Sequence, residues 1–99
     1  VQGLVIRNNK IIATETFKGT KKMLHSIKKS NKFYSILIKF PKKKQDLRID
    51  LPTIGLDTLK DCKKVGVVGV ILKSKQNIFM DKDKCINYAN KNKMFITIK

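Results

Sequence analysis

The sequence predicts an α/β fold: one small domain with a mixed central sheet and three helices. Three observations lead to this prediction. The chain has 99 residues, which suits one domain built around one core. Short runs rich in Val and Ile alternate with segments whose apolar residues recur every three or four positions, so strands alternate with helices. The elements follow approximately the order ββαβ, α, ββαβ, in which the two halves share an arrangement.

The first half is predicted to contain, in order, strands at 3–7 and 10–16, a helix at 19–30 and a strand at 33–40. Asn8 and Asn9 separate the first two strands, and asparagine tolerates the left-handed backbone that a tight hairpin turn requires. In the predicted helix, Met23, Leu24 and Ile27 share one side while lysines occupy the other, as in an amphipathic helix.

The second half is predicted to contain a helix at 57–65, strands at 67–73 and 76–80, a helix at 81–93 and a strand at 94–98. Gly66 ends the first of these helices. The run 67–73 is almost entirely apolar, as expected of a strand that is covered on both faces. In the last helix, Cys85, Ile86 and Ala89 are expected to face inward.

The two cysteines, Cys62 and Cys85, are predicted to be free thiols on the apolar faces of helices, where cysteine packs as a small hydrophobe. They form no CxxC pair and no signal peptide is recognised, so a reducing cytoplasm is expected. His25, the single histidine, lies opposite the apolar side of its helix. It is therefore predicted to be a solvated surface residue.

The formal net charge of +16 has two competing explanations. Basic domains bind nucleic acid or anionic membranes, because clustered cations release counterions from phosphates. Here the 23 basic residues are spread along the chain, and 21 of them are lysine rather than arginine. Lys, Ile and Asn supply 41 of the 99 residues, and A/T-rich codons encode all three. Codon bias is the explanation that these numbers favour.

The segment 45–55, QDLRIDLPTIG, carries the densest chemical signal in the chain. In an extended backbone, Asp46, Arg48 and Asp50 would share one face. The apolar residues that alternate with them, Leu47, Ile49 and Leu51, would anchor the other face. Two carboxylates beside a guanidinium suit a phosphate ester, since carboxylates bind Mg²⁺ or orient water and arginine grips phosphate oxygens. An ion pair that merely pins a loop explains the same spacing equally well.

This segment, followed by LDTLKDCKKVGVVGVIL, resembles the C-terminal domain of the UDP-2,3-diacylglucosamine pyrophosphatases of the LpxI type. That family carries a D-x-R-x-D-L-P-x-I-G motif, then a helix containing threonine and a strand punctuated by glycine. The earlier stretch 15–20, ETFKGT, resembles the family's E-x-x-E-G-T-D segment. The resemblance extends over essentially all 99 residues in order. It implies that residues 1–99 are the C-terminal catalytic domain, without the family's N-terminal domain.

The resemblance implies a reaction and a set of site residues. The reaction is hydrolysis of UDP-2,3-diacylglucosamine to UMP and 2,3-diacylglucosamine 1-phosphate in lipid A biosynthesis, with Mg²⁺ or another divalent cation as cofactor. The implied catalytic residues are Asp46, Asp50 and Arg48. The implied metal ligands are Asp46 and Glu15. The implied substrate-binding residues are Gly19, Thr20 and Arg48, with backbone N–H groups at a helix start available to phosphate.

Two departures from the family pattern leave the activity of the isolated chain open. Lys18 and Lys21 stand where the family pattern has acidic residues, and lysines there would repel a metal ion. The absent N-terminal domain would have to come from another chain. The expected partners are therefore the UDP-diacylglucosamine lipid and that missing domain, with a cytoplasmic location and peripheral contact with the anionic surface of the inner membrane.

The alternative function is a small basic nucleic-acid-binding module. It requires lysines that converge on one face with aromatic residues among them. Phe33, Phe40 and Phe95 fall in predicted strands, where core packing is the expected use, so nucleic acid is the less favoured partner.

Overall fold

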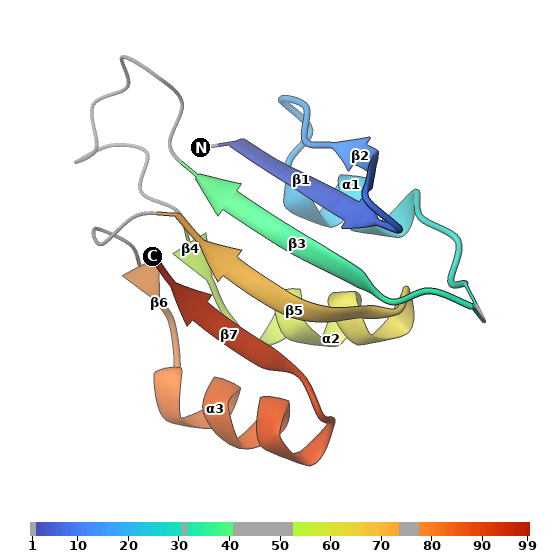
Figure 1. Cartoon of the computed structure of the whole chain (residues 1–99). Coiled ribbons are helices and arrows are strands. Elements are labelled where there is room, and N and C mark those ends of the chain that lie inside the picture. Colours follow the sequence, from blue (N-terminus) through green and yellow to red (C-terminus); the bar gives the residue numbers. More distant parts are fainter. Residues whose placement is uncertain (1, 31, 41–52, 74–77) are drawn as a thin grey trace.

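A computed structural model of the chain describes residues 2–30, 32–40, 53–73 and 78–99. A five-stranded mixed sheet forms its centre, in the strand order β2-β1-β3-β5-β7 (Figure 1). The antiparallel part is β1 (Gln2–Arg7) with its neighbours β2 (Lys10–Thr14) and β3 (Ser35–Phe40). The parallel part is β3, β5 (Val67–Leu72) and β7 (Phe95–Ile98). The predicted α/β class and mixed sheet are confirmed.

The β1–β2 hairpin forms as its asparagines predict. Asn8 and Asn9 have φ angles of 53° and 63°, and two successive residues in this left-handed region give the turn whose twist matches an antiparallel pair. Beyond β2 the ladder continues for one more bond, because the Glu15 N–H donates to the Gly3 carbonyl at 2.7 Å. This bond fixes the direction in which the chain leaves the sheet.

Three helices are present in the described part of the chain: α1 (Thr20–His25), α2 (Leu56–Lys64) and α3 (Lys82–Lys91). Gly66 follows α2 with a φ angle of 81°, as expected of the residue that ends a helix. The prediction of a helix reaching residue 30 is wrong. The Ser26 hydroxyl donates to the Met23 carbonyl at 2.6 Å and so competes with continuation of the helix.

All three helices pack on one face of the sheet and enclose the core with it. Met23 and Leu24 of α1, Leu59 and Cys62 of α2, and Cys85 and Ala89 of α3 are buried against Val5, Leu37, Val70 and Leu72 of the strands. One inward prediction is wrong, because the Ile86 side chain of α3 is 40% exposed. In the described residues no helix is long and apolar enough to span a membrane.

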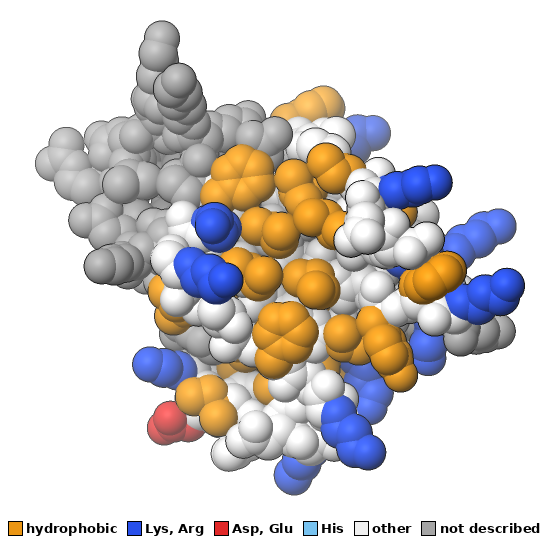
Figure 2. Space-filling view, in the orientation of Figure 1, with side chains coloured by type: hydrophobic (Ala, Val, Ile, Leu, Met, Phe, Trp, Pro, Cys, Tyr) orange, Lys and Arg blue, Asp and Glu red, His pale blue; other side chains and the backbone are white. Residues whose placement is uncertain are grey.

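The opposite face of the sheet is not covered by any described element, and Figure 2 shows apolar side chains gathered on it. We call this surface the open sheet face. Strand register assigns to it Leu4, Ile6, Ile11, Ile36, Ile38, Phe40, Ile71 and Phe95. Within the described residues, the expectation that 67–73 is covered on both faces is therefore wrong. The expectation of core packing is also wrong for Phe33 and Phe95, which are 44% and 42% exposed.

The predicted similarity of the two halves does not extend to their geometry. Gly3 pairs with Lys39 on the helix-covered face of the sheet, in a strand antiparallel to β3. Gly69 pairs with Phe95 on the open sheet face, in a strand parallel to β3. The similar runs GLVI at 3–6 and GVIL at 69–72 therefore occupy different environments.

Candidate functional site at the carboxyl ends of the parallel strands

The carboxyl ends of β3, β5 and β7 meet at one edge of the sheet, where sites of open α/β sheets commonly lie. The end of the 45–55 motif enters the described structure at this edge (Figure 1). Thr53–Ile54 forms β4, which pairs in parallel with β6 (Ile78–Phe79), and the Met80 N–H donates to the Ile54 carbonyl at 2.9 Å. Ile54 is fully buried and so anchors the motif. Asp46, Arg48 and Asp50 lie outside the described residues.

Glu15 and Thr20, both predicted site residues, are brought together. The Thr20 hydroxyl donates to Glu15 Oε1 in a short hydrogen bond. The Glu15 carboxylate lies over Gly3, where an added Cβ would come within 2.9 Å of Oε1. Gly3 is therefore the residue that lets this carboxylate rest against β1, on the helix-covered side of the sheet.

Lys39 completes this group, and the sequence reasoning did not identify it. Its side chain is only 5% exposed, on a strand position that pairs with Gly3 on one side and Leu72 on the other. Burial lowers the pKa of the Lys39 ammonium, and the neighbouring Glu15 carboxylate partly opposes that shift. A signal was available: in SILIKF, alternation places the lysine on the same face as Ser35 and Leu37, which are both buried.

Two further polar residues lie between α1 and α2. His25 Nε2 is 3.3 Å from Asp61 Oδ1, and the histidine and aspartate side chains are 49% and 12% exposed. The prediction that His25 is simply solvated is therefore incomplete, because it also ties α1 to α2. Asp61 is buried in the body of α2, so it makes this contact from within the helix and not from its first turn.

Both cysteines are free and buried, as predicted. Burial raises the pKa of the Cys62 thiol to about 12, and the Asp61 carboxylate adds to the shift while Lys39 opposes it. Burial also raises the pKa of the Cys85 thiol, whose Sγ donates to the Met80 carbonyl at 3.3 Å. Neither thiol is therefore a thiolate near neutral pH, and neither is suited to nucleophilic catalysis.

Glu15 is the single predicted metal ligand within the described residues. Its carboxylate already accepts a hydrogen bond from Thr20 and lies near the Lys39 ammonium. In the described ranges no group of three His, Cys, Asp or Glu side chains comes together. These residues by themselves do not fit Mg²⁺, which needs several oxygen ligands. The proposed set thus depends on Asp46, outside these ranges.

The other predicted contacts around the start of α1 have local roles. The Gly19 N–H donates to the Thr16 carbonyl at 3.0 Å, and Gly19, with a φ angle of 95°, precedes the helix. Lys18 and Lys21, the departures from the family pattern, are both exposed.

A hollow of about 310 Å³ adjoins the described end of the motif. Gly55 and Leu56 at the start of α2 form one side, and Met80 and Asp81 before α3 form another. Asp81 has a φ angle of 49°, in the left-handed region that Asp tolerates better than most residues. The hollow therefore lies where two helices begin, beside the carboxyl edge of the sheet.

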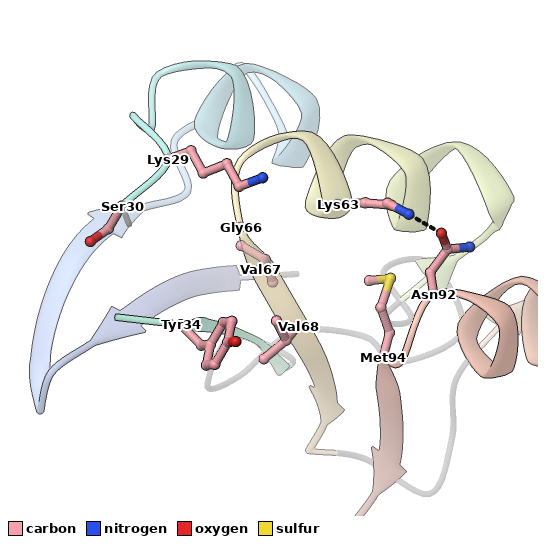
Figure 3. Close-up of a pocket in the computed structure, with 9 residues that line it drawn as sticks. All are labelled: Lys29, Ser30, Tyr34, Lys63, Gly66, Val67, Val68, Asn92 and Met94. Atoms are coloured by element: carbon pink, nitrogen blue, oxygen red, sulfur yellow. Dashed lines mark hydrogen bonds between the residues drawn. The ribbon is translucent and has the colours of Figure 1, made fainter. Parts of the chain in front are cut away.

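A second hollow, of about 170 Å³, lies at the opposite edge of the sheet (Figure 3). Lys29 extends over Gly66 from the loop after α1, and Lys63 of α2 donates a hydrogen bond to Asn92 Oδ1. Tyr34 lines its other side. An adjoining hollow shares Lys29 and Lys63 and adds Lys60, Lys64 and Tyr88. Four lysines and both tyrosines of the chain therefore surround one region, which suits an anionic ligand with flat groups.

Comparisons with known proteins identify relatives over nearly the whole chain. The family model described as the LpxI C-terminal domain matches residues 1–97. A UDP-2,3-diacylglucosamine pyrophosphatase LpxI from Caulobacter vibrioides is 27% identical over 103 residues. That match covers 96% of this chain and 37% of the relative, so the chain spans well under half of the relative's length.

Proposed function

Because the chain belongs to the LpxI C-terminal domain family, we propose that it is the catalytic-domain part of a UDP-2,3-diacylglucosamine pyrophosphatase of lipid A biosynthesis. The proposed reaction is attack of water on one phosphorus of the pyrophosphate. The P–O bond to the bridging oxygen breaks, and UMP and 2,3-diacylglucosamine 1-phosphate leave. The observation that carries the proposal is the family match, which includes the whole 45–55 motif.

The motif residues receive the following roles in the proposal. Asp46 orients the attacking water and accepts its proton, Arg48 contacts the phosphate oxygens on which charge develops, and Asp50 holds Arg48 in place. Gly19 and Thr20 are proposed substrate contacts near the start of α1.

Lys39 supports the proposal as an additional phosphate contact. It is a buried cation at the edge where the motif joins the sheet, and a phosphate oxygen is the partner that a desolvated ammonium favours. Glu15, which accepts a hydrogen bond from Thr20, would attract this ammonium in the absence of substrate.

Mg²⁺ stays part of the proposal as the family's cofactor, with Asp46 and Glu15 as its candidate ligands. When bound, it would neutralise charge on the pyrophosphate. UMP release should fall when Mg²⁺ is omitted and a chelator is added. This measurement tests the cofactor separately from the role of Asp46.

The experiment measures UMP release from UDP-2,3-diacylglucosamine. It compares this chain alone with this chain plus the region of the Caulobacter relative that lies outside the match, because the missing part of the site is expected there. Asp46→Ala should lower the rate by roughly 10²–10⁴-fold, as loss of a proton-accepting group does.

Asp83→Ala is the matched control, since Asp83 is an exposed carboxylate in the first turn of α3. It should leave the rate unchanged. Equal rates for Asp46→Ala and Asp83→Ala would refute the assignment of the motif. No UMP release in either mixture would refute catalysis by this chain.

The proposal places the chain in the cytoplasm, in peripheral contact with the inner membrane that would carry the acylated substrate. Each lysine near an anionic surface contributes about 1 kcal/mol to binding. Sedimentation with vesicles tests the contact: more protein should pellet with phosphatidylglycerol vesicles than with phosphatidylcholine vesicles, and equal pelleting would contradict it.

One observation favours the second candidate function, binding of single-stranded nucleic acid. Lys29, Lys63 and their neighbours converge with Tyr34 and Tyr88 at the edge of the sheet opposite the motif. Binding of single-stranded nucleic acid requires lysines along the phosphate backbone and aromatic rings nearby on which the bases stack.

Fluorescence titration with an oligouridylate measures this second function. Lys63→Gln combined with Lys64→Gln should reduce the salt dependence of binding by about one to two phosphate contacts. The control, Lys21→Gln combined with Lys22→Gln at two exposed positions of α1, should not reduce it. Equal effects would indicate attraction by net charge alone.

A further inference from the structure

The open sheet face carries apolar side chains along most of its strands. Figure 2 shows them gathered over the sheet, with polar or backbone atoms between some of them. By strand register its residues are aliphatic or aromatic, apart from Gly69 and the polar residues Gln2, Thr14 and Thr97. A soluble monomer rarely exposes a contiguous patch of several hundred Å², so such a patch marks an interaction site.

The surface is flat as well as apolar. The Phe95 ring lies across Gly69, where an added Cβ would come within 2.1 Å of the ring carbons. The ring therefore lies along the sheet instead of projecting from it. Leu4, Ile36 and Ile38 are only partly exposed, because neighbouring side chains shade one another. A flat layer of this kind fits the packing of one sheet on another, in which two apolar faces meet about 10 Å apart.

The area of the open sheet face agrees with what a stable pair of sheets needs. Its five strands are four to six residues long. At about 4.8 Å between strands and about 3.3 Å per residue, the face measures roughly 24 by 17 Å, or about 400 Å² in projection. Side chains increase this area, so two faces together would bury on the order of 1,000 Å² or more, the lower limit for a specific interface.

The charged side chains of the described strands and their ends lie at the margin of the open sheet face or on the opposite face. Lys73 and Lys99 directly follow β5 and β7 and are exposed, whereas Lys39 belongs to the helix-covered face. No described strand residue on the open sheet face is charged, so a partner needs no complementary charge at its centre. An identical face meets that requirement, and two-fold pairs of identical surfaces are the commonest assemblies.

We propose that the open sheet face is the contact surface of a homodimer, in which two copies of this chain pack sheet against sheet. The inference does not depend on the proposed hydrolysis, because it rests on the row of side chains that points away from the candidate site.

Salt dependence distinguishes this partner from the others. Two copies of a chain with a net charge of +16 repel each other, and added salt screens that repulsion while it strengthens apolar contact. Dimerisation should therefore tighten as sodium chloride increases. Binding to an anionic vesicle, a nucleic acid or an acidic protein should weaken under the same change.

Sedimentation velocity of the chain between about 5 and 500 μM, at about 0.15 and 1 M sodium chloride, tests the proposal. A concentration-dependent dimer that tightens in the higher salt is expected. Ile38→Lys places a charge at the centre of the face and should weaken dimerisation at least about 100-fold. Ile86→Lys is the matched control, because Ile86 is an isoleucine of α3 that is 40% exposed outside the face. It should dimerise like the wild type.

A measurement on the unmodified chain covers the case in which Ile38→Lys fails to fold. On dilution, the NMR methyl signals of Ile36 and Ile38 should shift, and that of Ile86 should not. A monomer at every concentration and salt overturns the proposal, whether it then binds anionic vesicles, the remaining region of the Caulobacter relative, or neither. The proposal is also overturned if the Ile38→Lys variant still dimerises. It is overturned likewise if dilution shifts the methyl signal of Ile86 instead of those of Ile36 and Ile38.

Discussion

Replacing Lys39 with methionine should stabilise the isolated domain while removing a proposed substrate contact. Lys39 is 5% exposed, and its lowered pKa means that burial outweighs the attraction of Glu15. Methionine has a similar length and no charge to desolvate. Residues kept at a cost in stability are common at functional sites, which is the reason to test this one.

The size of the effect follows from two opposing contributions. Methionine avoids the desolvation penalty of the buried ammonium, which is on the order of several kcal/mol per ion before the interactions of that ion offset part of it. Against this, Glu15 would lose a cationic neighbour, which costs about 0.5–1 kcal/mol because its carboxylate is partly exposed and keeps the Thr20 hydroxyl. We therefore expect a net gain of about 1–2 kcal/mol at pH 7, equivalent to roughly 5–15 °C in Tm for a domain of this size.

The pH dependence gives this prediction a second signature. Because the pKa of Lys39 is lower in the folded state than its ordinary 10.5, the unfolded chain binds more protons between the two values. The stability of the wild type relative to Lys39→Met therefore rises as pH increases through the folded pKa toward 10.5. The advantage of the methionine variant should be largest near neutral pH and should shrink by pH 10.

Urea unfolding at pH 7 and pH 10 measures both quantities, and other titrating groups cancel in the difference between variants. Lys10→Met is the matched control, since Lys10 is an exposed lysine of β2, and its effect should be within about 0.5 kcal/mol at both pH values. A Lys39→Met domain less stable than the wild type at pH 7, or a difference that does not change with pH, would contradict the reasoning.

Three further predictions concern single residues. The pKa of about 12 for Cys62 leaves about one thiol in 10⁴ ionised at pH 8. A disulfide reagent should therefore modify Cys62 only after urea is added. Fast labelling of Cys62 in the native chain would contradict its burial. Gly69→Val should destabilise the domain by about 1–3 kcal/mol in thermal unfolding, and by much less in a Phe95→Ala background, because the clash is with that ring. Gly66→Ala should cost about 1 kcal/mol by the same measurement, since alanine is strained at a φ of 81°, and an unchanged Tm would mean that the turn after α2 relaxes.

Much of the element order could be predicted from the sequence, because local signals determine it. The asparagines of the hairpin turn and the glycine after α2 act through their own backbone preferences, and apolar periodicity identifies the helices and strands. The end of α1 could not be predicted in this way. Its apolar period continues to Ile27, but the Ser26 hydroxyl bonds back to the Met23 carbonyl and the helix stops at His25.

The candidate site was predictable only in part. Glu15 and Thr20 are five residues apart, so a local pattern could pair them. Lys39 joins them through strand pairing with Gly3, and Asp61 meets His25 across 36 residues, so neither contact follows from local sequence. The motif aspartates Asp46 and Asp50 lie outside the described residues, and their roles stay predictions.

The alternation of β3 explains why the proposed catalytic and assembly functions can be tested separately. Leu37 and Lys39 point to the helix-covered side, where Lys39 meets Glu15, while Ile36 and Ile38 point to the open sheet face. A period of two therefore gives one strand two independent surfaces, and a substitution in one row leaves the other row in register. Ile38→Lys should dissociate the dimer without touching the Lys39 environment, and Lys39→Met should change the site without touching the dimer contact. If each variant instead altered both readouts equally, the two surfaces would be coupled through the sheet, and neither function could be assigned to one row alone.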